Sequence, residues 1–127
     1  MESIEGNKLI VALQKELAKN GIKKDAMVKG LKELRPYALE EQDPTLTKVI
    51  RLTYEHIEAN DTFNIPLPTE EAIEVEEGEE PQMIINEIKT DADRVESLNY
   101  LLSLMLDRKN PTNQLDMYEY RDALKAY

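Results

Sequence analysis

The amino-acid sequence predicts a mostly α-helical protein, a compact bundle of about five helices. In five segments of the chain, apolar residues recur three and four positions apart, which is the spacing of an amphipathic helix. Turn-forming pairs separate these segments, and an irregular acidic crossover, residues 61–90, divides the third from the fourth. The 127 residues are enough for one domain. We therefore expect a single helical domain, 1–127; the alternative is two helical halves, 1–61 and 84–127, joined by an acidic linker.

The first two helices are expected on either side of a glycine-containing turn. The apolar stripe of the first, between residues 7 and 20, consists of Leu9, Ile10, Leu13 and Leu17. Gly21 should end this helix, because glycine readily adopts the left-handed conformation found at helix ends. Asp25 is the expected N-cap of the second helix. Its stripe consists of Met27, Val28, Leu31 and Leu34. Pro36 should end or kink it, because proline disfavours the helical conformation in the preceding residue.

The third helix should begin at Asp43-Pro44, which combines a capping carboxylate with a proline in the first helical position. Its apolar face consists of Leu46, Val49, Ile50, Thr53, Tyr54 and Ile57. The helix should end close to Asn60, where the apolar periodicity stops.

The crossover after the third helix is expected to be irregular, with its Glu-rich part solvated. Ile65 and Leu67 each precede a proline and should therefore be extended. Seven of the eleven residues 70–80 are glutamate, and such a run of like charges repels itself. Ile73 and Val75 alternate with glutamates, which leaves room for a short strand.

The fourth and fifth helices are expected on either side of Asn110-Pro111. Thr90 and Asp93 resemble a capping box at the start of the fourth. Its apolar stripe is the strongest in the chain: Val95, Leu98, Leu101, Leu102, Met105 and Leu106. Either Thr112 or Asn113 should cap the fifth helix, whose expected inward residues are Leu115, Tyr118, Leu124 and Tyr127. Tyr118 and Tyr120 are two positions apart and cannot share a face, so one should be buried and the other more exposed.

The sequence carries no signature of a catalytic, cofactor-binding or metal-binding site. It has no cysteine, and none of its three serines lies in a nucleophile elbow. The four glycines are scattered, so no phosphate-binding loop is formed. The single histidine, His56, lies near the end of the third helix and is expected to contact the last carbonyls there. We therefore expect no cofactor and no metal, and we assign no catalytic residue.

The formal net charge of −10 is unevenly distributed. Residues 1–60 contain ten bases and ten acids, whereas residues 61–127 contain six bases and sixteen acids. The excess negative charge opposes general affinity for nucleic acid or anionic membranes. Basic residues nevertheless gather in and before the second helix. The candidate interaction surface there consists of Lys23, Lys24, Lys29, Lys32 and Arg35.

Strong helical patterning without active-site chemistry favours a non-catalytic helical protein–protein interaction module, whose partner is another protein or a second copy of itself. One alternative is a nucleic-acid-associated regulator that uses the basic face of the second helix. A third hypothesis is a carboxylate-based enzyme. The Glu-rich run can also lie across the lysine face, within one molecule or between two, although exposed ion pairs contribute only about 0–1 kcal/mol each. The acidic N-terminus and the lack of cysteine favour a cytoplasmic protein, with no membrane partner.

Overall fold

The computed structural model describes residues 1–71, 78 and 83–127. The described part contains five helices and one pair of short strands. The helices are α1 (Ile4–Asn20), α2 (Lys24–Glu40), α3 (Pro44–Asn60), α4 (Asp91–Leu106) and α5 (Pro111–Ala126); the strands are β1 (Glu70–Glu71) and β2 (Met83–Ile84). The prediction of a mostly α-helical bundle is confirmed. Within the described ranges, no helix has the length and apolar character needed to span a membrane.

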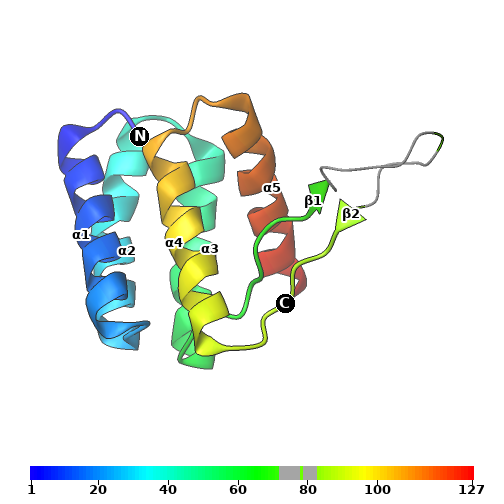
Figure 1. The fold of residues 1–127 in the computed structure, drawn as a ribbon. Coiled ribbons are helices and arrows are strands. Elements are labelled where there is room, and N and C mark those ends of the chain that lie inside the picture. Colours follow the sequence, from blue (N-terminus) through cyan, green and yellow to red (C-terminus); the bar gives the residue numbers. More distant parts are fainter. Residues whose placement is uncertain (72–77, 79–82) are drawn as a thin grey trace.

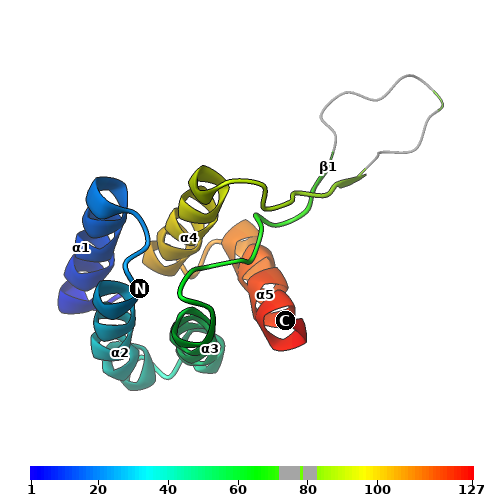
Figure 2. The same cartoon turned by 90° about the horizontal axis from the view of Figure 1, so that it is seen from below.

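The five helices form a closed ring, in the spatial order α1, α2, α3, α5 and α4 (Figure 2). Helices that follow one another in the chain run in opposite directions (Figure 1). Short connections require this arrangement. α3 and α5 are also neighbours but run parallel, because the crossover and α4 lie between them in the chain.

Side-chain caps define the beginning of α1, α3, α4 and α5. The Ser3 side chain accepts a hydrogen bond from the Gly6 backbone N–H at the start of α1, three residues before the predicted beginning. Asp43 caps α3 as predicted, and Thr90 and Asp93 form the predicted capping box of α4. These side chains stabilise the first helical turns because they bond to N–H groups that have no partner within the helix.

Three predicted helix boundaries are wrong. α2 begins at Lys24, so Asp25 lies in its first turn rather than at the N-cap. Of the two predicted outcomes at Pro36, an end of the helix is wrong, because α2 continues to Glu40. Packing accounts for the difference, because Leu34 and Ala38, on either side of the proline, are both fully buried. At the other end of the chain, Asn110 caps α5 in place of Thr112 or Asn113, and Pro111 occupies its first position.

Both halves of the chain contribute to one hydrophobic cluster. α1 contacts α4 and α3 contacts α5, so each half covers apolar residues of the other. Tyr120 is 1% exposed and Tyr118 is 37% exposed, which confirms that only one of them is buried. Of the predicted inward residues of α5, Leu124 is buried, whereas Leu115, Tyr118 and Tyr127 are exposed. The other buried residues of this helix are Met117 and Tyr120.

The first part of the crossover, residues 61–69, is packed onto the bundle. Phe63 and Ile65 are buried among the core residues. The Ser97 hydroxyl donates a hydrogen bond of 2.6 Å to the Ile65 carbonyl, and the Tyr120 hydroxyl donates one of 3.0 Å to the Ser97 carbonyl. The backbone N–H of Thr69 donates to the Glu119 carboxylate. α4 and α5 therefore hold this segment in place.

The second part of the crossover begins with an antiparallel pair of strands. Glu70 of β1 is paired with Ile84 of β2, and Glu71 with Met83. In both views the two strands extend away from the bundle on the side of α5 (Figures 1 and 2). Residues Ile73 and Val75, for which a short strand was predicted, lie outside the described residues.

Candidate functional site

The predicted lysine face of α2 lies mostly beside acidic residues. Lys24 is 3.2 Å from the Asp61 carboxylate, and Lys32 is 3.2 Å from that of Glu58. A hollow of about 550 Å³ on this face is lined by three bases and three acids: Lys24, Asp25, Lys29, Lys32, Glu33 and Glu58, with Val28. Much of the positive charge predicted here is therefore balanced locally.

Two members of the predicted surface lie away from this hollow. Lys23 is exposed in the turn before α2, where it occupies the N-cap position without a side-chain cap. Arg35 lies near the other end of α2 and lines a different groove, between α2 and α3. The structure thus brings Lys24, Lys29 and Lys32 together and separates Arg35 from them.

The groove between α2 and α3 has a volume of about 450 Å³. Its basic side chains are Arg35, Lys48 and Arg51. The groove contains one acid, Asp43, whose carboxylate accepts two hydrogen bonds from Arg108. The charge of Asp43 is therefore already compensated, and the groove presents a net positive charge.

Two bases of α5 add to this positive charge. The pKa of Lys48 is lowered, first because its ammonium group contacts that of Lys125 and then through burial and the charges of Arg51 and Arg121. Like charges this close disfavour the protonated form. Five bases from three helices are thus gathered on one face. We call them the basic cluster: Arg35, Lys48, Arg51, Arg121 and Lys125.

Only part of the basic cluster is neutralised within the chain. Arg51 lies 3.8 Å from the Glu55 carboxylate, and Arg121 lies 3.0 Å from that of Asp122. In the described residues, neither Arg35 nor Lys48 forms an ion pair, and the buried Nε of Arg35 has no hydrogen-bond partner. An anionic group entering the groove would meet two uncompensated cations.

The sequence contains a partial signal for this cluster. Lys48 and Arg51 are three residues apart, and Arg121 and Lys125 are four apart, so each pair shares a helix face. The contact between the two faces depends on the parallel packing of α3 against α5, which helical periodicity does not predict. The cluster was therefore missed, except for Arg35.

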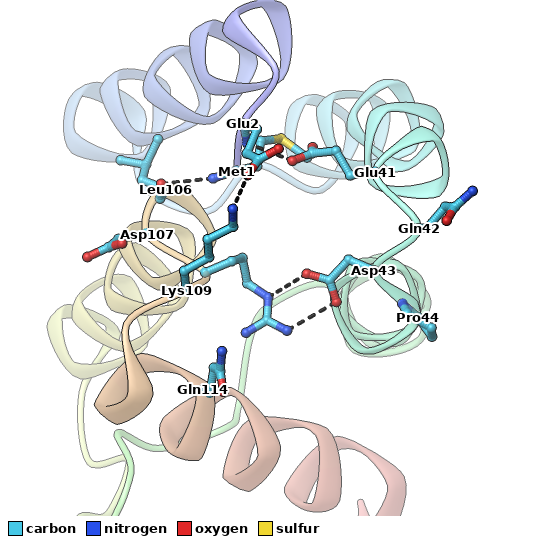
Figure 3. Close-up of a pocket in the computed structure, with 11 residues that line it drawn as sticks. Met1, Glu2, Glu41, Gln42, Asp43, Pro44, Leu106, Asp107, Lys109 and Gln114 are labelled. Carbon is cyan, nitrogen blue, oxygen red and sulfur yellow. Dashed lines mark hydrogen bonds and ion pairs between the residues drawn. The ribbon is translucent and has the colours of Figure 1, made fainter.

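Another cavity, of about 650 Å³, lies at one end of the bundle. The N-terminal segment, the α2–α3 turn and the α4–α5 turn meet there (Figure 3). Its ionisable side chains converge but are largely paired with one another. Arg108 forms hydrogen bonds of 2.9 and 3.1 Å with the Asp43 carboxylate. Lys109 pairs with Glu2, and the Glu2 backbone N–H donates to the Glu41 carboxylate.

The chemistry of this cavity is that of a structural ion-pair network. Burial tends to raise the pKa of Asp43, but the hydrogen bonds from Arg108 and Leu46 and the Arg108 charge outweigh it and lower the pKa. Asp43 is therefore a poor proton acceptor near neutral pH. The lining includes no serine, cysteine, histidine or tyrosine. In the described part of the chain, no cluster of three or more histidine or acidic side chains is arranged to hold a metal ion.

These geometries were compared with known proteins. The chain matches no family model, no curated protein and no solved structure. The assignment of function therefore depends on the residues themselves.

His56 is held in the core. The sequence predicted instead that it would contact the last carbonyls of α3. Its side chain is buried, and its Nε2 atom accepts a hydrogen bond of 3.0 Å from the backbone N–H of Asn64. Its ring packs against the edges of Phe63 and Tyr127, with centroid distances of 5.6 and 4.6 Å. The neutral imidazole thus serves as an acceptor for the crossover segment.

Burial lowers the pKa of His56 in the folded protein, so its effect on stability has a defined sign. Above its unfolded pKa of about 6.5, both states are neutral and the full stability is present. Stability should fall as the pH decreases below that value towards the lowered folded pKa, because the unfolded state binds the proton more tightly. We expect His56→Gln, which retains a side-chain acceptor, to flatten this decline in urea titrations between about pH 7.5 and 5. Equal slopes for the two proteins would contradict the assignment.

Proposed function

We propose that this protein is a non-catalytic interaction module that binds an acidic protein segment in the groove between α2 and α3. The observation that supports this proposal is the basic cluster, in which Arg35 and Lys48 have no carboxylate partner in the described residues. The cluster is contributed by three helices of the ring, so its geometry is fixed by the packed core rather than by a loop. A preformed set of charges binds an anionic ligand with little loss of conformational entropy.

An acidic protein segment fits the groove better than nucleic acid does. The formal net charge of −10 repels a long polyanion, whose binding depends on a field that extends over many phosphates. The basic cluster is short and has the acids Glu55 and Asp122 at its edges. Local charge pairing favours a short ligand with carboxylates along an extended backbone.

The proposal can be tested with a fluorescein-labelled glutamate decapeptide and a single-stranded DNA of similar length. We expect the peptide to bind in low-salt buffer and to be released as salt is added. Lys48→Glu combined with Arg51→Glu should weaken peptide binding by at least about tenfold, because it reverses two charges that line the groove.

The matched control is Lys23→Glu combined with Lys29→Glu, which changes the net charge equally on a different face. This control should bind the peptide within about twofold of the unaltered protein. Equal losses in both variants would mean that net charge alone governs binding, and the proposal would fail. DNA binding that is tighter than peptide binding and is lost with Lys48 and Arg51 would favour a nucleic-acid regulator instead.

A further inference from the structure

The acidic charge of this protein is concentrated in one short run. Residues 70–80 contain seven glutamates and no base. The rest of the chain has nineteen acids and sixteen bases, a net charge of only −3. The protein therefore consists of a nearly neutral remainder, which carries the basic cluster, and one strongly acidic segment. A negative charge spread over the whole surface would make two copies repel each other. The uneven distribution of charge reduces this repulsion.

The acidic run begins at a point that is fixed to the bundle. Thr69 donates hydrogen bonds to the Glu119 carboxylate of α5 through both its backbone N–H and its hydroxyl. Asn86, after the run, donates one of 2.9 Å to the Pro68 carbonyl. Between these two attachments, β1 and β2 extend away from the helices (Figures 1 and 2). The described strands that flank the run therefore point away from the helices.

We propose that the groove between α2 and α3 binds residues 70–80 of a second copy of this chain. This inference rests on the proposed function and names the partner. The groove offers Arg35 and Lys48 without carboxylate partners, together with Arg51; the two bases of α5 lie beside Lys48. The run contains seven glutamates, more than enough to pair with Arg35 and Lys48. In an extended segment, alternate side chains on one face are about 6.6 Å apart, a spacing that allows several of them to reach bases on adjacent helices.

Each copy contributes this groove and one acidic run. In a pair of copies, the run of each can therefore bind the groove of the other. Such an arrangement is a closed dimer with two equivalent contacts. Exposed ion pairs are individually weak, and the dimer should therefore depend on several pairs and dissociate as salt screens them. The expected behaviour is a concentration-dependent monomer–dimer equilibrium in low salt.

The test uses charge exchange between two full-length variants, measured by sedimentation velocity over a range of concentrations in low salt. The groove variant combines Lys48→Glu with Arg51→Glu. The segment variant combines Glu74→Lys, Glu76→Lys and Glu77→Lys. Each variant alone should have a dimer dissociation constant at least tenfold higher than that of the unaltered protein. The groove variant loses two of the three bases that line the groove, and the segment variant lowers the charge of the run from −7 to −1. An equimolar mixture should recover part of the dimer, because it restores one unaltered contact between the groove of the segment variant and the run of the groove variant.

The control is Lys23→Glu with Lys29→Glu, which should dimerise like the unaltered protein. Failure of the mixture to recover the dimer would overturn the inference, as would a dimer that persists in both single variants. A protein that stays monomeric at every concentration would also overturn it. If that monomer still binds the glutamate decapeptide through Lys48 and Arg51, the proposed function stands and only the identity of the partner is wrong.

Discussion

Replacing Phe63 by alanine should lower the free energy of unfolding by about 3–5 kcal/mol, the usual loss for a buried aromatic side chain. Phe63 is fully buried and is the only phenylalanine in the chain. It packs between the rings of His56 on α3 and Tyr120 on α5, at centroid distances of 5.6 and 6.3 Å. Its removal leaves a cavity where the crossover meets two helices, and the surrounding helices can close it only partly.

The change can be measured by urea denaturation followed by circular dichroism at 222 nm. Tyr118→Ala is the control, because Tyr118 is an aromatic residue on the exposed face of α5. It contacts only the guanidinium of Arg121 among the described aromatic and cationic pairs, so its loss should amount to less than about 1 kcal/mol. Similar losses for the two variants would show that Phe63 is not packed as described.

Asp43→Ala should lower the free energy of unfolding by about 3 kcal/mol. Two effects combine: the loss of the N-cap of α3 and the loss of the carboxylate that compensates Arg108. The Arg108 side chain is only 11% exposed, so its charge would be left largely out of contact with water. Such a stranded charge costs more than the ion pair itself contributed.

A second substitution separates these two effects. Adding Arg108→Met to Asp43→Ala removes the stranded guanidinium, and the double variant should regain about 1–2 kcal/mol relative to Asp43→Ala alone. Glu2→Ala serves as a control in the same cavity, because its partner Lys109 is 83% exposed. Its effect on stability should be too small to detect. A double variant less stable than Asp43→Ala would indicate that the arginine does not depend on this carboxylate.

The helical framework was readable from the sequence wherever local chemistry alone determines structure. Gly21, Asp43 and the Thr90–Asp93 pair define helix ends through interactions within a few residues of the chain. The prediction was wrong where the burial of neighbouring side chains outweighs the local conformational preference of a residue. Pro36 lies within α2 because the neighbouring Leu34 and Ala38 are buried, which compensates for the missing backbone hydrogen bond.

The crossover illustrates a second limit of sequence reasoning. Residues 61–69 have no helical or strand periodicity, and the prolines at 66 and 68 predict only extended structure. What holds the segment is contributed by distant residues, above all Ser97, Tyr120 and Glu119. Side chains separated by more than 20 residues form these bonds, so no local pattern reveals them.

By itself, the sequence determined the number of helices, several of their ends, the position of the acidic run and the lack of a recognisable catalytic motif. The tertiary structure decided how the helices are placed. Gly30, which the sequence marks only as a weak helix former, lies where an added Cβ would be 2.3 Å from the Leu13 side chain. Likewise, the parallel packing of α3 and α5 gathers the basic cluster. Both features depend on contacts between separate helices. Helical periodicity indicates which residues face inwards, but not which helix they contact.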